Sequence, residues 1–321
     1  NRVNLEYKLI RLKYRKFINN FLSSKFKKVD GLLKILESES PDIILFHGCV
    51  GLELLTLKKY KKLNSKVKIY IDTHESYHNS GKNFLSLFFQ YRVLTRTIVR
   101  YIDDCIESYL FTCFESKQFI IDNCGVDSSK LQEFLLGGDI IDNSELQMKR
   151  EKFRKEQHIN EKKIIYAITG KFDERKKLVE VINYFTESSY EDEILLIGGK
   201  IDYEEKKVFE LIQANDRIKF LGWLKYQELF ELLCATDVYI QPGSQSATMQ
   251  VACCLKNMMI IHKNFNYRSI FGEYKYLIEN PNDLKNIFGN LNIDEIRRNI
   301  DYCMNVSREK LNYAKISKVY K

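Results

Sequence analysis

Short apolar runs alternate with longer amphipathic stretches along most of this 321-residue chain. Runs such as Ile43–Phe46 and Val67–Ile71 have the length and β-branched content of buried strands. Strands that are joined through helices pair in parallel, because a crossover returns the chain to the same end of the sheet. The pattern therefore predicts an α/β fold built from doubly wound parallel sheets. Further strands are expected at Tyr109–Phe114, Leu131–Leu136, Ile164–Thr169, Ile194–Ile197, Ile218–Leu221, Val238–Ile240, Met258–Ile261 and Tyr276–Ile278.

The alternation falls into two halves, separated by a polar, charged stretch at residues 140–162. We expect an N-terminal Rossmann-like domain over residues 1–145, a second over residues 146–300 and a helical tail over residues 301–321. Residues 1–40 have roughly helical spacing of apolar positions, and Asn83–Tyr101 predicts a long amphipathic helix. If the two domains face each other, the carboxyl ends of their strands border one cleft, where open α/β sheets bind ligands.

Composition narrows the class of protein. Charged residues at 29% and apolar residues at 45% are typical of a soluble globular chain, and no run is long enough to span a membrane. The first residues lack the apolar core of a signal peptide, and none of the eight cysteines forms a CxxC pair, so we expect reduced thiols and a cytoplasmic location.

The net charge of +8 suits an anionic partner. Lys and Arg are spread along the chain without a nucleic-acid-binding motif, so no nucleic-acid partner is expected. In the Asn83–Tyr101 helix, Arg92, Arg96 and Arg100 recur every four residues. This stripe is either a solvated face or a membrane-surface contact, and peripheral association with the inner face of the membrane stays open.

Two stretches could bind phosphate. In TGKFDERKK, Lys171 follows a predicted strand and Lys176 stands near the start of the next helix. In Asp237–Asn264 a strand ends at Pro242-Gly243, and Ser244 or Ser246 could cap the helix that follows. Cations and a helix N-terminus together favour a diphosphate. The alternatives are a solvated charge run and an ordinary crossover. GxxxxGK[ST] and GxGxxG are both absent, which argues against a P-loop NTPase or a dinucleotide-dependent dehydrogenase.

The order of these motifs carries a family resemblance. PDIILFHG, VKIYIDTHESYHNS and CGVDSSKLQEFLLGGD precede the GK-x4-K loop, which is followed by LLIGG, RIKFLGWL and ATDVYIQPGSQSATMQVACC. Over about residues 40 to 290 the chain resembles the GT-B glycosyltransferases, closest to the retaining family-four (glycosyl transferases group 1) type. The family's opening Gly-rich strand and loop are not visible, which leaves two alternatives: a truncated N-terminal domain, or a lineage that differs from the family here.

The resemblance implies roles for named residues. Lys171 and Lys176 would hold the donor diphosphate, and His74 would contact the donor sugar or acceptor as a third catalytic residue. The segment Gly222-Trp223-Leu224 would bind the nucleobase. The remaining donor-binding residues would be Gly170, Gly199, Pro242, Gly243, Ser244, Gln245, Ser246, Ala247, Thr248 and Gln250. The family usually has two Glu residues where this chain has Pro242 and Gln250, and a Gly where it has Leu255.

The implied activity is transfer of a sugar from a nucleoside-diphosphate sugar to a hydroxyl, with retention, no cofactor and no metal. The acceptor would be a glycan, a lipid-linked glycan or a protein, in surface polysaccharide or glycoconjugate assembly. Two alternatives remain: a GT-B-type nucleotide-sugar epimerase that recruits Asp72, Glu75 and Asp139, and a non-catalytic sugar-nucleotide-binding partner subunit.

Overall fold

The computed structural model describes residues 8–16, 26–77, 80–81, 83–188 and 191–320. The chain divides into two compact units, Asn1–Leu135 and Leu136–Lys321, each with its own parallel sheet. This division lies at the start of the polar stretch, and residue 145 lies inside the helix α6 (Asn143–Glu156). The helix α13 (Ile293–Val306) runs across residue 301, and residues 301–321 belong to the second unit.

The sheet of the first unit has four strands in the order β1-β2-β3-β4, and every neighbouring pair is parallel. Its strands are β1 (Ile43–His47), β2 (Lys68–Thr73), β3 (Ser108–Phe111) and β4 (Leu131–Glu133). The central strand β2 is buried on both faces, which explains its nearly continuous apolar run. In the register of β1 and β2, His47 is opposite Asp72, so both residues lie at the carboxyl edge of the sheet.

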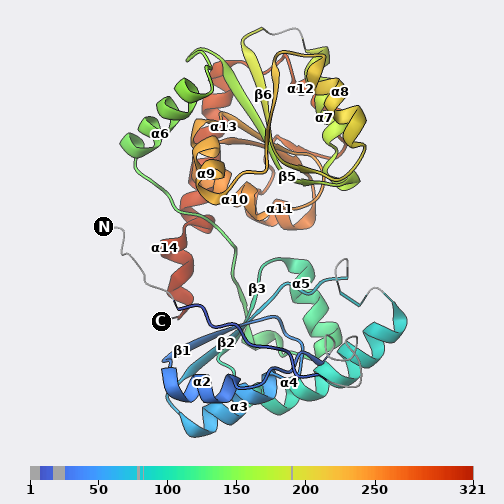
Figure 1. The fold of residues 1–321 in the computed structure, drawn as a ribbon, viewed down its shortest axis with the longest axis vertical. Coiled ribbons are helices and arrows are strands. Elements are labelled where there is room, and N and C mark those ends of the chain that lie inside the picture. Colours follow the sequence, from blue (N-terminus) through green and yellow to red (C-terminus); the bar gives the residue numbers. More distant parts are fainter. Residues whose placement is uncertain (1–7, 17–25, 78–79, 82, 189–190, 321) are drawn as a thin grey trace. The chain divides into compact units, whose positions relative to one another are not determined.

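Helices α2, α3 and α4 lie along one side of this sheet (Figure 1). The helical elements are α2 (Leu32–Glu39), α3 (Leu54–Leu63), η1 (Ser86–Thr95), α4 (Arg96–Ile102), η2 (Asp103–Cys105), α5 (Phe114–Phe119), η3 (Ile120–Cys124) and η4 (Ser128–Lys130). Ile69 and Ile71 of β2 pack with Leu57, Ile98 and Val99 in one buried cluster. This apolar core fixes the sheet and leaves its carboxyl edge to polar side chains.

Two predictions for the first unit need correction. Residues 8–16 are not helical; Tyr14 instead forms an isolated antiparallel bridge with Val29. Residues 1–7 and 17–25 lie outside the described part of the chain. The predicted helix at Asn83–Tyr101 exists, but its middle, η1, has π-helical geometry, and the α-helical parts are Phe84, Leu85 and α4.

The sheet of the second unit has six strands in the order β10-β9-β8-β5-β6-β7, all paired in parallel. Its strands are β5 (Ile164–Phe172), β6 (Glu193–Ile201), β7 (Ile218–Gly222), β8 (Val238–Gln241), β9 (Met258–His262) and β10 (Leu277–Ile278). From β5 the chain builds outward through β6 and β7, and then returns to place β8 on the other side of β5. The strand order therefore reverses between β5 and β8, and such a switch point is where doubly wound sheets bind ligands.

Helices cover both faces of this sheet. Figure 1 shows α7, α8 and α12 on one side of β5 and β6, and α9, α10 and α13 on the other. Besides α6 and α13, the helical elements are η5 (Glu174–Lys176), α7 (Leu178–Glu187), α8 (Glu205–Gln213), α9 (Tyr226–Ala235), α10 (Ala247–Cys254), α11 (Phe265–Phe271), α12 (Asp283–Ile287), η6 (Ser307–Leu311), α14 (Tyr313–Ile316) and η7 (Ser317–Tyr320).

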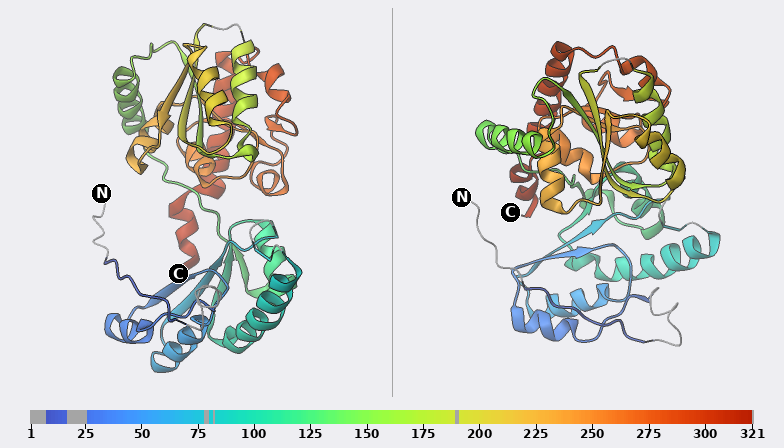
Figure 2. Two further views of the ribbon diagram at one scale, coloured as in Figure 1. Left: turned by 45° about the vertical axis from the view of Figure 1, so that its right-hand side comes forward. Right: turned by 45° about the horizontal axis from the view of Figure 1, so that its top comes forward.

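These two parallel sheets, also visible in the turned views of Figure 2, confirm the predicted α/β class with Rossmann-like units. That the units face each other across a cleft stays a prediction. All eight cysteines are free thiols, and each is buried except the half-buried Cys113. Among the described residues, no helix is both long enough and apolar enough to cross a bilayer.

Candidate functional site

The switch point of the second sheet brings together the two stretches that the sequence singled out. After β5 the chain forms the short 3-10 turn η5, which ends at Lys176. After β8 it forms the loop at residues 242–246, and the backbone N–H of Ser244 donates to the carbonyl oxygen of Arg175 at 3.1 Å. A Cβ on Gly243 would come within 1.7 Å of that oxygen. Only glycine permits so close an approach of the two backbones.

Lys176 is the central cation of this site. Its side chain folds back over the end of β5, with Nζ 3.6 Å from the position that a Cβ on Gly170 would occupy. Only 8% of the residue is exposed, and within the described residues no carboxylate forms an ion pair with it. Burial lowers the pKa of Lys176 to about 8, with Asp173 acting to raise it and Arg175 to lower it further. A buried ammonium without an ion-pair partner gains most from an anionic ligand.

Lys171 has a different environment. It lies on β5 opposite Lys200 on β6, and its side chain is exposed. It is therefore five residues before Lys176 and at the same end of the sheet, but in solvent rather than under the loop. The sequence predicted Lys171 in the turn after the strand, but β5 continues to Phe172 and includes it. Of the two lysines predicted to hold the diphosphate, Lys176 is buried and Lys171 is exposed.

The loop at residues 242–246 is held from several sides. Ser246 caps α10, since its Oγ accepts from the backbone N–H of Thr248 at 3.2 Å. The backbone N–H of Ser246 donates to the hydroxyl of Tyr267 at 3.0 Å. Buried Gln241 donates through Nε2 to the carbonyl oxygen of Ser244. The N-terminus of α10, with the positive end of its dipole, is thereby fixed beside Lys176. Gln245 in this loop and Ala247 at the start of α10 are exposed.

Gln250 has a partner that the sequence did not predict. It is 7% exposed, and its Oε1 accepts from the backbone N–H of Gly137 at 2.6 Å. A Cβ on Gly137 would lie 2.2 Å from the carbonyl oxygen of Leu311. Gln250 therefore secures the start of the second unit to α10. Pro242 is buried at the end of β8.

A pocket of about 450 Å³ opens at the ends of β6 and β7. It is lined by Gly199, Lys200, Phe220, Gly222 and Trp223, among others. Trp223 is 64% exposed, and such a surface aromatic can stack on a flat ring. The neighbouring Leu224 packs against Gly198, where a Cβ would come within 2.7 Å of Leu224 Cδ1. The segment predicted to bind the nucleobase thus combines an exposed ring with a half-buried side chain that packs against β6.

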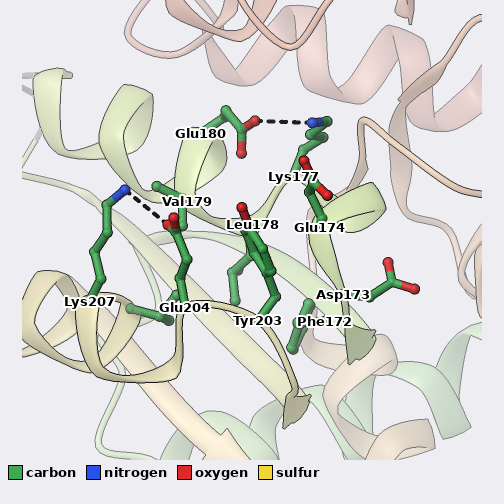
Figure 3. A pocket seen from close by; sticks show the side chains of 11 residues that line it. Phe172, Asp173, Glu174, Lys177, Leu178, Val179, Glu180, Tyr203, Glu204 and Lys207 are labelled. Atoms are coloured by element: carbon green, nitrogen blue, oxygen red, sulfur yellow. Dashed lines mark hydrogen bonds and ion pairs between the residues drawn. The ribbon is translucent and has the colours of Figure 1, made fainter.

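A second pocket, of about 290 Å³, lies between α7 and α8 (Figure 3). Its lysines are already paired: Lys177 with Glu180 at 3.4 Å and Lys207 with Glu204 at 2.9 Å. A lysine whose charge is already balanced by a glutamate attracts a pyrophosphate less strongly than Lys176, which has no ion-pair partner among the described residues. This pocket therefore suits a diphosphate less well than the turn beside it.

The first unit has a separate polar cluster at the carboxyl edge of its sheet. Asp72 lies between two histidines, with His47 Nδ1 at 3.0 Å and His74 Nε2 at 3.5 Å from Asp72 Oδ2. The imidazole rings are 4.8 Å apart. Burial acts to raise the pKa of Asp72, but the hydrogen bonds from His74 and His47 outweigh it and hold that pKa below its ordinary value. The hydrogen bond with Asp72 raises the pKa of His74, against the effect of burial.

A pocket of about 180 Å³ opens over this cluster, lined by Lys27, His47, Gly48, His74, Glu75 and Ser80. Glu75 is buried and accepts hydrogen bonds from the Thr73 hydroxyl and from the backbone N–H groups of Cys49 and His74. Its carboxylate therefore fixes the loop after β2. Thr112 Oγ1 contacts His74 Nδ1 at 3.3 Å.

Comparison with known families decides the identity of the second unit. Residues 149–302 match the family model described as Glycosyl transferases group 1. The second unit is a group 1 glycosyltransferase domain. The motif-based resemblance is thereby confirmed, and this domain belongs to a glycosyltransferase family. A comparison with curated protein sequences gave no significant match.

Solved structures agree on the fold. The Anabaena protein HepE, in complex with UDP and glucose, is 13% identical with a TM-score of 0.61, over 89% of this chain and 79% of that one. A Rickettsia africae glycosyltransferase is 13% identical with a TM-score of 0.65, over 95% and 81% of the two chains. Sucrose-phosphate synthase from Thermosynechococcus elongatus is 12% identical with a TM-score of 0.64, over 97% and 82%. The chain therefore has the GT-B fold.

The structure adds two features near the predicted site residues that the sequence did not predict. The partnership of His47 with Asp72 follows from the register of β1 and β2, which the sequence does not state. Within the described residues, His47, Asp72 and His74 also form a group whose ligand atoms lie within 4.8 Å of one another, close enough to hold a metal ion. Of the carboxylates considered for an epimerase, Asp72 and Glu75 are brought together, whereas Asp139 belongs to the second unit.

Proposed function

We propose that this glycosyltransferase moves a sugar from a nucleoside-diphosphate sugar to a hydroxyl acceptor, with retention at the anomeric carbon and without a metal or cofactor. The donor diphosphate binds at the switch point of the second sheet, and the nucleobase binds near Trp223. HepE has been solved with UDP-glucose, and an E. coli structure described as trehalose-6-phosphate has been solved with UDP-2-fluoro glucose. These ligands support a nucleotide sugar as the donor here.

The observation that carries this proposal is the position of Lys176. An ammonium that is nearly buried, has a lowered pKa and lies under a helix N-terminus is costly to keep unless an anion binds there. A pyrophosphate supplies that anion. Gly243 lets the loop after β8 approach the carbonyl oxygen of Arg175, and this contact brings the N-terminus of α10 to the turn that carries Lys176.

In the proposed reaction the bond between the anomeric carbon and the diphosphate oxygen breaks, and a bond from the acceptor oxygen to that carbon forms. The acceptor proton passes to the departing diphosphate oxygen. Lys176, the dipole of α10 and the solvent-exposed Lys171 stabilise the negative charge that grows on the leaving group. His74 contacts the donor sugar or the acceptor. Most of the catalytic effect then comes from positioning and charge stabilisation.

The geometry supports the transferase over an epimerase. An epimerase needs a carboxylate pair with one protonated member, yet Asp72 has a lowered pKa and Glu75 accepts three hydrogen bonds. A non-catalytic partner subunit is the remaining alternative, because Gln250 and Pro242 stand where the family has glutamates. Transfer of sugar to any acceptor would dismiss it.

The proposed acceptor is a glycan or a lipid-linked glycan, in surface polysaccharide or glycoconjugate assembly, with a protein acceptor as the alternative. We place the reaction in the cytoplasm at the inner face of the membrane. No nucleic-acid partner is proposed.

The test is a thermal-shift panel with UDP, GDP, ADP, CMP and their sugars on the wild-type chain and on Lys176→Met. We expect one nucleoside diphosphate to raise the melting temperature of the wild type and to leave Lys176→Met unchanged. Lys207→Met removes a lysine that is paired with Glu204 and should keep the full shift. Equal shifts in Lys176→Met and the wild type would rule out the phosphate site. Product analysis with donor alone then separates the epimerase, which needs no acceptor.

A further inference from the structure

The helix at one edge of the first unit has two apolar faces. Tyr91, Thr95, Ile98, Val99 and Ile102 form the buried face of η1 and α4. Apolar residues that are well exposed lie on the opposite face: Phe84 (74%), Leu85 (65%), Phe88 (41%), Phe89 (60%) and Val93 (47%). We call these five residues the apolar stripe. The core already takes the buried face, so folding of this unit does not account for the stripe.

The stripe is continuous along the helix. The rings of Phe84 and Phe88 are stacked with centroids 5.9 Å apart, and Phe89 meets Phe88 edge-on at 5.2 Å. Leu85, Phe89 and Val93 follow one another every four residues, and the wider turn of a π-helix keeps such residues on one side. In both views of Figure 2 the teal helix that carries them lies at the edge of the first unit. Scattered exposed side chains are ordinary, but a contiguous exposed apolar patch marks a binding surface.

The charges around the stripe are of one sign. Asn83–Ile102 contains Arg92, Arg96 and Arg100 and no Asp or Glu. Arg92 and Arg100 are exposed. Asp103 and Asp104 follow the helix, but Lys130 pairs with Asp103 at 3.0 Å and Lys58 pairs with Asp104 at 2.8 Å. Arg92 Nε donates to Asn123 Oδ1 at 3.0 Å, and among the described residues none of the three arginines forms an ion pair. An apolar face bordered by such arginines complements a surface that is apolar inside and anionic outside.

We propose that the apolar stripe is a docking surface for an anionic phospholipid membrane, on which this helix lies in the interfacial plane. A second copy of the chain fits less well, because an isologous contact would bring the same arginines together without acids to pair them. The stripe inserts among the lipid chains while Arg92 and Arg100 contact the headgroup phosphates. This docking does not depend on the identity of the donor or acceptor, and its test measures binding alone.

The experiment compares two double variants of the full chain in vesicle flotation. Phe84→Ser/Phe89→Ser removes two rings of the stripe. Leu63→Ser/Met148→Ser removes two apolar side chains that are equally exposed, at 63% and 61%, but lie elsewhere. The vesicles contain either phosphatidylcholine alone or phosphatidylcholine mixed with phosphatidylglycerol. Melting temperatures and UDP-dependent thermal shifts verify that both variants are folded and that the donor site is intact.

We expect the wild type and the Leu63/Met148 variant to float with the mixed vesicles, and the Phe84/Phe89 variant to bind at least about tenfold more weakly. Arg100→Gln should weaken binding to mixed vesicles, as should added salt. Equal binding of the two double variants would overturn the proposal. A second combination of results would also overturn the proposal: the wild type does not bind vesicles but forms a concentration-dependent dimer, and the Phe84/Phe89 variant does not form that dimer. Loss of the UDP-dependent thermal shift in a variant would instead show a damaged donor site, which bears on the proposed function and not on membrane docking.

Discussion

Gly243 presses against the carbonyl oxygen of Arg175 so closely that a Cβ there would come within 1.7 Å of it. This contact joins the loop after β8 to the turn after β5, and it fixes the N-terminus of α10 beside Lys176. We predict that Gly243→Ala pushes the loop away and destabilises the chain by roughly 1–3 kcal/mol, the usual cost of overpacking. Donor affinity should fall with it. Thermal melting and UDP titration measure both, and Gln245→Ala, an exposed change in the same loop, should alter stability little.

Lys176→Ala should lower turnover by about two orders of magnitude, because removal of one group that stabilises the developing charge typically costs that much. Lys171→Ala should also lower turnover, but less, since that lysine is exposed to solvent. Steady-state kinetics with a defined donor and acceptor measures the effect. Normal turnover in both variants would remove the diphosphate role from this turn, and Lys207→Ala serves as the neutral comparison.

The lowered pKa of Lys176 makes two effects depend on pH. A diphosphate binds the protonated form, so affinity should fall as pH rises through about 8, approaching tenfold per pH unit above it. Binding near pH 8 should take up a proton, which calorimetry in buffers of different ionisation enthalpy detects. Lys176→Arg keeps its charge at these pH values, so its affinity should stay flat over the same range.

The lowered pKa of Lys176 affects folding stability in the opposite direction to donor affinity: stability should rise as pH rises. Between pH 8 and the ordinary lysine pKa of about 10.4, the unfolded chain binds more protons at this position than the folded chain does, so stability should rise with pH. At neutral pH the buried ammonium destabilises the fold. Lys176→Met should therefore raise the melting temperature near pH 7 while abolishing donor binding. A lowered melting temperature would contradict this account.

His74→Ala should abolish transfer and leave donor binding largely intact, because His74 belongs to the first unit and the proposed phosphate site to the second. Turnover and UDP-dependent thermal shifts separate the two effects. Tyr77→Phe, in the same unit, removes only a surface hydroxyl that is hydrogen-bonded to Asp122 and should retain activity. A collapse of donor affinity in His74→Ala would contradict the assigned role.

Asp237 should matter for stability rather than for catalysis. Its carboxylate pairs with Arg150 at 2.6 Å and with Arg154 at 3.0 Å, and it accepts from the backbone N–H of Ile165 at 2.8 Å. Asp237→Ala leaves the buried Arg154 unpaired and should cost about 3–5 kcal/mol. Asp202→Ala breaks an exposed pair with Lys200 and should change the free energy of unfolding by less than about 1 kcal/mol. Chemical denaturation compares the two.

The sequence predicted most of the strands because parallel strands that are buried on both faces consist of nearly uninterrupted apolar residues, as in β2 and β8. It also placed Lys176 and the loop at residues 242–246 at one switch point, since strand ends and turn residues are local signals. It failed for residues 8–16, where apolar positions among Lys and Arg have roughly helical spacing, but the chain forms no helix and only Tyr14 makes a bridge. Gln250 and Gly137 are 113 residues apart, and no local pattern reveals such a hydrogen bond.

Cys113 is the one thiol of the eight that solvent reaches in part, and it directly follows Thr112, whose hydroxyl contacts His74. Seven sulfurs are shielded by the cores of the two units. A thiol-reactive fluorophore should consequently attach at a single position without any engineering of the chain. Its emission would report, in real time, when a sugar or an acceptor enters the pocket above the paired imidazoles.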